Sequence, residues 1–321
     1  MFFNYLILLW VLLVVGLILA GATVRAMASV ILRPPRMTDG RAAWRLKRLS
    51  PGDLRLRYSE VTFEVRDELT GDRLKLTAWW IPCSRATGRC AILLHGYGDA
   101  KVGAIAWAPT LHELGFNILA LDLRAHGGSE GDACTAGFFE RHDVSQVIDQ
   151  LRRDKPRETG QIVLFGVSLG AAVAAATAVL REDIAAVVME CPFADYELAA
   201  ASHADVLGAP GKHLQTMAFR QAQKMARADF SAVRPLDLIP RIACPLMVIR
   251  SEADVFVDEA QAVRVEAATR GRGEAMGVTV YWNAENAHHV AALYEDPAGY
   301  RERLGKFFKV ALGGGADVVV P

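Results

Sequence analysis

The sequence predicts an α/β fold with a mostly parallel sheet, and three observations support this class. Short, continuously apolar segments of strand length recur along the chain. Stretches with helical character separate most of them. The 321 residues are enough for one large domain and an appendage. Alternation of this kind places helices on both faces of a parallel sheet, with functional sites at the carboxyl ends of the strands.

The strand-like segments are of two kinds. Residues 58–66 and 74–81 flank a turn that contains Gly71, and they predict a hairpin at a sheet edge. The later segments are apolar, as expected of strands covered on both faces: residues 90–94, 117–123, 161–165, 185–189, 245–249 and 278–282. Helices are predicted at residues 104–114, 140–153, 169–181, 258–269 and 298–312.

The composition argues against several functional classes. Lys plus Arg equals Asp plus Glu, at 36 each, so no nucleic-acid partner is expected. The five cysteines are scattered and lack zinc-site spacing, which indicates thiols in a reducing compartment. A Cys83–Cys90 disulfide is conceivable only if the domain is exported. Because the H-E-x-x-H motif is also absent from the sequence, we expect no metal site and no zinc hydrolase.

The N-terminal segment predicts a membrane helix. Residues 2–24 carry no charged side chain and are long enough to cross a bilayer. The basic residues that follow, in the linker of residues 25–51, favour a single-pass anchor with the rest of the chain in the cytoplasm. The alternative is a secretory signal cleaved near Ala20-Gly21-Ala22, with a periplasmic or secreted domain.

A candidate nucleophile lies between a predicted strand and a predicted helix. Residues 166–170 read GVSLG, with Ser168 at the centre. A serine in a sharp strand-to-helix turn needs small neighbours, because a Cβ on either side would clash. The turn exposes the Ser168 hydroxyl, and the helix N-terminus stabilises negative charge beside it. The alternative interpretation is a glycine-rich connector whose serine only caps the helix.

Donors for an oxyanion hole are predicted at the same edge of the sheet. The strand of residues 90–94 runs into residues 95–98, HGYG. The backbone N–H of Tyr97 can face the same oxyanion as the N–H of Leu169. His95 and His126 also follow strands, where an imidazole usually bonds to backbone, so we expect both to be structural.

These motifs in this order resemble the α/β-hydrolase superfamily. Residues 95–98, then residues 122–131 (DLRAHGGSEG), then residues 166–170 are most similar to its bacterial serine-aminopeptidase-like and esterase-like branch. The similarity covers residues 58–312. It implies an eight-stranded sheet with an antiparallel second strand, a Ser–Asp–His triad and no cofactor. Ala125 departs from the pattern, because many relatives carry Gly there.

The resemblance also implies the two partners of Ser168. It places the acid at Asp254, with Glu252 as a rival, while Asp258 is expected to cap the following helix. Counting back from Asp296 and Pro297, as in similar sequences, selects His289 rather than His288 as the base. An imidazole in that position takes the hydroxyl proton and returns it to the leaving group.

The expected organisation is therefore an α/β-hydrolase domain over residues 52–314, with a small cover over residues 192–240 and a tail over residues 315–321. The expected activity is a serine hydrolase acting through an acyl-enzyme, with an esterase acting on an apolar or lipid-like acyl substrate favoured. A peptidase or acyltransferase of the same fold is an alternative. A non-catalytic, membrane-tethered binding protein is an alternative from another class.

Overall fold

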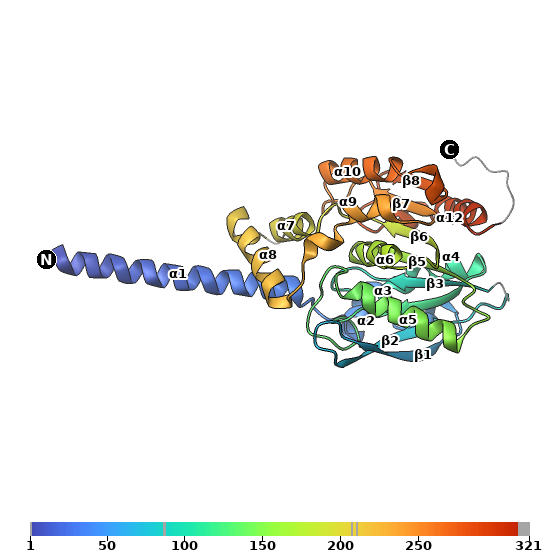
Figure 1. Ribbon diagram of the computed structural model, residues 1–321, viewed down its shortest axis with the longest axis horizontal. Coiled ribbons are helices and arrows are strands. Elements are labelled where there is room, and N and C mark those ends of the chain that lie inside the picture. The colour runs from blue at the N-terminus through green and yellow to red at the C-terminus, as the bar shows by residue number, and fades with distance from the viewer. Residues whose placement is uncertain (1, 86–87, 207, 210, 314–321) are drawn as a thin grey trace.

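The computed structural model describes residues 2–85, 88–206, 208–209 and 211–313. It contains an eight-stranded sheet with helices on both faces, as the sequence predicts (Figure 1). The strands are β1 (Ser59–Arg66), β2 (Arg73–Ile81), β3 (Arg89–Leu94), β4 (Asn117–Leu121), β5 (Gln161–Val167), β6 (Ile184–Glu190), β7 (Leu246–Ser251) and β8 (Thr279–Ala284).

The strands are ordered β1-β2-β4-β3-β5-β6-β7-β8. Strand β2 runs antiparallel to both of its neighbours, and all other neighbouring pairs are parallel. The fold class predicted from the sequence is therefore confirmed, including the antiparallel second strand. Strands β3, β5, β6 and β7 lie together in the sheet, so the loops after them share one edge.

Two helical layers cover the sheet, and strand side chains alternate between them. Ile92 and Leu164 belong to the buried cluster under one layer, whereas Leu93 and Phe165 belong to the other. The first layer consists of α5 (Glu140–Asp154), α6 (Leu169–Leu180), α9 (Pro235–Leu238) and α10 (Glu259–Arg270). The second consists of α2 (Asp39–Leu46), α3 (Lys101–Ala104), α4 (Ala108–Glu113), α11 (Ala292–Glu295) and α12 (Pro297–Ala311).

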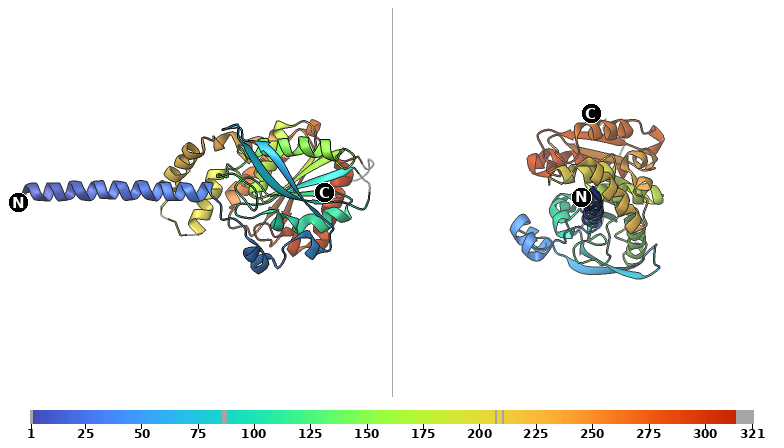
Figure 2. Two further views of the ribbon diagram at one scale, coloured as in Figure 1. Left: turned by 90° about the horizontal axis from the view of Figure 1, so that it is seen from below. Right: turned by 90° about the vertical axis from the view of Figure 1, so that its left-hand side faces the viewer.

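Helix α1 (Phe2–Leu32) extends far out of the domain as a single rod (Figures 1 and 2). Most of its hydrophobic side chains between residues 3 and 19 are exposed, and it is long and apolar enough to cross a membrane. Its C-terminal turns pack beside α7 (Tyr196–Val206) and α8 (Lys212–Ala226), the two helices of the region after β6.

Several boundaries differ from the sequence-based expectation for local reasons. Helix α1 continues beyond residue 24 and ends at Leu32, because Arg33 precedes a proline and a residue in that position disfavours helical backbone. The helix expected over residues 104–114 is divided, with Pro109 in the first turn of α4. The expected tail of residues 315–321 lies outside the described residues.

Candidate active site

Ser168 lies in a strained turn between β5 and α6. Its backbone angles are φ 52° and ψ −115°, a conformation that L-residues rarely adopt. A Cβ on Gly166 would lie 2.1 Å from the carbonyl oxygen of Gly170. A Cβ on Gly170 would lie 2.0 Å from the carbonyl oxygen of Leu94. Both flanking glycines are therefore required by the backbone packing around this serine.

The structure brings Ser168, His289 and Asp254 into one chain of hydrogen bonds. The Nε2 atom of His289 lies 3.0 Å from the Oγ atom of Ser168. Its Nδ1 atom lies 2.6 Å from Oδ2 of Asp254. An Nδ1–H donated to the carboxylate leaves Nε2 as an acceptor for the serine hydroxyl. The three residues come from the loops after β5, β7 and β8, at one edge of the sheet.

The environment of Asp254 favours its ionised form. Its Oδ1 atom accepts backbone N–H bonds from Phe256 at 2.8 Å and Val257 at 3.0 Å. Burial alone raises the pKa of this carboxyl, but the hydrogen bond and charge of His289 and the two N–H donors hold that pKa below its ordinary value. The side chain is 3% exposed, so an ionised carboxylate is fixed beside the imidazole.

The rival residues are placed elsewhere. Glu252 accepts the backbone N–H of Asn286 at 3.0 Å. Asp258 caps α10 and accepts the N–H of Gln261 at 2.8 Å, as predicted. His288 is exposed, and its Nδ1 atom lies 3.3 Å from the carbonyl oxygen of Ala253.

The two predicted oxyanion donors flank the serine. Leu169 is the first residue of α6, and N–H groups of a first helical turn have no partner within the helix. Tyr97 follows β3 in a loop that approaches Ser168. A Cβ on the preceding residue, Gly96, would lie only 3.6 Å from the serine Cβ. Tyr97, Ser168 and Leu169 line the same pocket.

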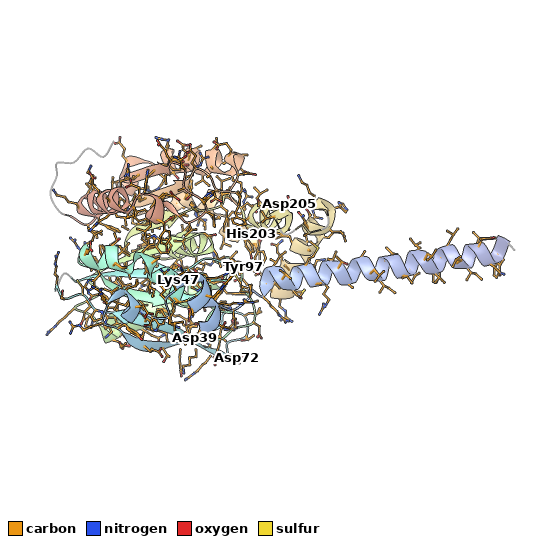
Figure 3. The ribbon with its side chains drawn as sticks, turned by 180° about the vertical axis from the view of Figure 1, so that it is seen from behind. Asp39, Lys47, Asp72, Tyr97, His203 and Asp205 are labelled. Atoms are coloured by element: carbon orange, nitrogen blue, oxygen red, sulfur yellow. The ribbon has the colours of Figure 1, made fainter. Side chains whose placement is uncertain are left out.

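That pocket has a volume of about 670 Å³ and a mostly apolar wall. Its size is typical of a small-molecule site. Besides the three residues at its base, it is lined by side chains from α1, α7 and α8. His203 of α7 is among them and stacks on Phe256, whose ring contacts His289 at a centroid distance of 5.1 Å. Figure 3 shows Tyr97 and His203 on the side of the domain from which α1 leaves.

One further residue at this edge, Glu190, was missed by the sequence analysis. Glu190 ends β6, and its carbonyl oxygen accepts the N–H of Ser168 at 2.8 Å. Its carboxyl group accepts bonds from Trp107 Nε1 at 3.1 Å and Tyr300 Oη at 2.6 Å, and burial raises its pKa to about 7. An acidic residue directly after an apolar strand was the available signal. Cys191 follows it with a φ of 50°.

Among the described residues, one group has the spacing of a metal site: Cys191, Asp254 and His289, with ligand atoms within 4.8 Å of one another. Asp254 and His289 are already bonded to each other. Burial raises the pKa of the Cys191 thiol well above its ordinary value, which disfavours the thiolate that a metal requires. These donors therefore fit a metal poorly.

Comparisons with known proteins support the fold class. A family model described as "Serine aminopeptidase, S33" matches residues 86–234. The solved structure of an esterase from Pyrococcus furiosus is 25% identical and superposes with a TM-score of 0.67, over 87% of this chain and 97% of that one. The chain belongs to the α/β-hydrolase superfamily.

Two curated relatives add to this membership. An uncharacterised Bacillus subtilis protein, YqkD, is 28% identical over 227 residues, which cover 69% of this α/β hydrolase and 71% of YqkD. A thiohydrolase from Aspergillus aculeatus is 30% identical over 138 residues, which cover 42% of each chain. The match therefore spans less than half of the thiohydrolase.

The loop after β4 in this α/β hydrolase is held by hydrogen bonds from β2, from α3 and from the loop itself. The carboxylate of Asp122 accepts from Lys101 N at 2.6 Å, Thr77 Oγ1 at 2.8 Å and Gly128 N at 3.0 Å. As predicted, the histidines of the loops after β3 and β4 bond to backbone. His95 Nε2 accepts the N–H of Leu123 at 3.0 Å, and His126 Nδ1 lies 2.8 Å from the Arg124 carbonyl.

Ala125 in this loop has a φ of 61°, in the left-handed region that favours glycine. The backbone conformation therefore gives a reason for a glycine here.

Proposed function

We propose that this α/β hydrolase is a membrane-anchored serine hydrolase that cleaves an apolar acyl ester through an acyl-enzyme on Ser168. The observation that carries the proposal is the hydrogen-bonded series Ser168–His289–Asp254 at the base of an apolar pocket. A nucleophile, a base and an orienting acid within hydrogen-bond reach are the minimum for this chemistry.

The proposed reaction has two balanced steps. The Ser168 oxygen attacks the ester carbonyl carbon while His289 takes the hydroxyl proton, and the same imidazole then protonates the departing alcohol. A water molecule next gives its proton to His289 and attacks the acyl-enzyme. The acid is released, and Ser168 recovers its proton. Asp254 holds the imidazole and stabilises its charged form throughout.

The negative charge on the substrate oxygen develops beside backbone donors. The N–H groups of Leu169 and Tyr97 are the proposed oxyanion hole, with the N-terminus of α6 contributing its partial positive charge. One such donor contributes about 3–4 kcal/mol to transition-state stabilisation.

Esters are the proposed substrates because the pocket wall is mostly apolar and a solved relative is an esterase. The thiohydrolase among the relatives makes a thioester the nearest alternative, since both bonds are cleaved by the same steps. In either an ester or a thioester, an apolar acyl chain matches the mostly apolar pocket wall.

The first test uses purified full-length protein, p-nitrophenyl esters of increasing acyl length and a fluorophosphonate probe, with Ser168→Ala as the matched blank. We expect the wild type to be labelled and to hydrolyse the esters, and Ser168→Ala to lose both activities, with a fall in kcat of about a millionfold. A folded wild-type protein that neither reacts with the probe nor cleaves any ester would contradict the proposal and favour a binding function.

The proposed localisation is a retained anchor with the domain in the cytoplasm, on the basis of the basic residues after residue 24. A reporter fused to the C-terminus tests the orientation. Active alkaline phosphatase together with a silent cytoplasmic reporter would place the domain on the other side. The apparent mass of the mature chain separates a retained anchor from a cleaved signal.

A further inference from the structure

The last turns of α1 are fixed to the hydrolase domain. Val24, Ala28 and Leu32, spaced four residues apart, form a buried stripe on this helix. The helix packs against α8 along this part of its length. Such a stripe defines one orientation of α1 against the domain, which a flexible tether would not have.

The backbone carbonyl groups at the end of α1 also accept hydrogen bonds from the domain. The Val30 carbonyl accepts from the Tyr97 hydroxyl, and the Ile31 carbonyl accepts from Tyr196 Oη at 3.2 Å. The Leu32 carbonyl accepts the backbone N–H of Cys134 at 2.8 Å. Terminal helical carbonyls have no partner within their own helix. The domain therefore completes this helix end, and one of its donors is the residue proposed for the oxyanion hole.

The same turns of α1 form one wall of the pocket above Ser168. Ala26, Met27, Val30 and Ile31 line it, opposite side chains of α7 and α8. In Figure 3, Tyr97 lies where α1 meets the domain, and His203 and Asp205 lie beside that junction, on the cap formed by α7 and α8. The pocket is therefore enclosed partly by the helix that carries the apolar N-terminal segment.

The position of this wall relative to a bilayer follows from the sequence. The charge-free segment ends at Val24, and Ala26 follows two residues later, about 3 Å farther along the helix axis. Helices α7 and α8 lie beside α1 (Figure 1), and they carry exposed large apolar side chains: Leu198, Val206 and Met217. The pocket therefore begins within one helical turn of the expected membrane boundary.

We propose that the acyl chain of a bilayer lipid ester moves along α1 into this pocket and reaches Ser168 without passing through water. This inference rests on the proposed function and specifies its substrate class: esters dissolved in the membrane to which the protein is attached. The wall formed by α1 selects for a long acyl chain, because such a chain fills the space between α1 and the two cap helices.

The first experiment places a bulky side chain in the pocket wall formed by α1. Full-length wild type, Ala26→Trp and Ala22→Trp are reconstituted in phosphatidylcholine vesicles and assayed with p-nitrophenyl palmitate and p-nitrophenyl acetate. Ala26 lines the pocket and Ala22 does not, although both are exposed alanines one turn apart on α1. We expect Ala26→Trp to lower the palmitate-to-acetate rate ratio by about tenfold or more, and Ala22→Trp to leave it unchanged. Equal ratios in the three proteins would overturn the role of α1 as a pocket wall.

The second experiment identifies where the substrate comes from. The total amount of p-nitrophenyl palmitate is held constant while inert phosphatidylcholine in the same vesicles is increased. Delivery from the bilayer predicts a rate that falls in proportion to the mole fraction of ester in the membrane. A rate that follows the total ester concentration, independent of its mole fraction, would overturn delivery from the bilayer.

These outcomes can be distinguished from a failure of the proposed function. If the function fails, wild type and Ser168→Ala cleave both esters equally slowly. If only the membrane route fails, the wild type remains active and dependent on Ser168, while the ester ratio or the dilution result is the opposite of that expected.

Discussion

Two loops at the same edge of the sheet use polar residues in opposite ways. In the loop after β4, Asp122 has four hydrogen-bond donors from this chain, and the Arg124 guanidinium is held by two carboxylates. In the turn after β5, Ser168 has a strained backbone and a side chain that contacts His289 and also lines an open pocket. Both loops are rich in glycine in the sequence.

The difference shows how to separate a structural polar cluster from a reactive one. Asp122 and Arg124 have their bonding capacity filled by protein groups, so changing them affects folding. Ser168 retains an open side, so changing it or its partner is expected to affect the proposed chemistry. The following variants test this separation, in order of decreasing expected effect.

His289→Ala is expected to reduce kcat by about a millionfold while leaving the thermal midpoint nearly unchanged, because the variant removes the proposed base but few packing contacts. Ester hydrolysis and thermal unfolding in one detergent measure the two effects. His288→Ala is the matched control, since this exposed neighbour has a different partner. Loss of fluorophosphonate labelling only in His288→Ala would reverse the assignment.

Arg124→Met is expected to give the converse result. The guanidinium bonds to Asp143 at 2.6 and 2.7 Å and to Asp67 at 2.8 Å, and its removal leaves two carboxylates unpaired. The expected loss in the free energy of unfolding is about 3–5 kcal/mol. The rate per labelled active site should be retained.

Arg73→Met is the control for this variant, because Arg73 pairs with Glu64 on the surface, where both side chains are more than half exposed. Its expected cost is at most about 1 kcal/mol. Equal destabilisation by the two substitutions, measured by urea unfolding, would show that the buried pairs near the site have no special role in stability.

Glu190→Gln is expected to change how stability depends on pH. Burial raises the pKa of Glu190 to about 7 from an ordinary 4.5. Between these pH values the Glu190 carboxyl is protonated in the folded protein and ionised in the unfolded chain. Stability from this group is fully present below about pH 4.5 and is lost as the pH rises through about 7. Thermal midpoints measured across this range should fall less in Glu190→Gln. The same dependence of the thermal midpoint on pH in Glu190→Gln and wild type would contradict the raised pKa of Glu190.

The smallest effect is expected for Ala125→Gly. A non-glycine residue in the left-handed region costs about 1–2 kcal/mol, and part of the gain is lost to the greater freedom of glycine in the unfolded chain. We expect stability to rise by less than about 1 kcal/mol. Ala267→Gly on the exposed face of α10 is the control and should destabilise by about 1 kcal/mol. A loss of stability in both variants would show that the backbone strain at Ala125 is compensated by other interactions.

Much of the fold could be predicted because its signals are local. The apolar strands and the helices after them follow directly from periodicity, and glycines on either side of Ser168 mark the sharp turn. The end of α1 was harder to predict. Residues 25–32 look like a basic linker in the sequence, and their helical packing depends on α8, which is distant along the chain.

The candidate site divides in the same way. Ser168 could be identified from its own neighbours, whereas Asp254 and His289 needed a resemblance because their proximity is a property of the sheet edge. Glu190 was missed, since the sequence shows an acidic residue after an apolar strand but not whether that residue is buried. The contribution of α1 to the pocket could not be derived from periodicity, because it joins residues 26–31 to helices that follow β6.

The bond from Tyr196 to the Ile31 carbonyl has a consequence for the order of events during synthesis. Its two residues are separated by 165 positions in the chain. At about 5–20 residues per second, the ribosome needs roughly 10–30 s to produce the second after the first. Helix α1 therefore emerges from the ribosome long before the residues that hold its end exist. The wall of the pocket is in place first, and the rest of the enzyme is assembled onto it.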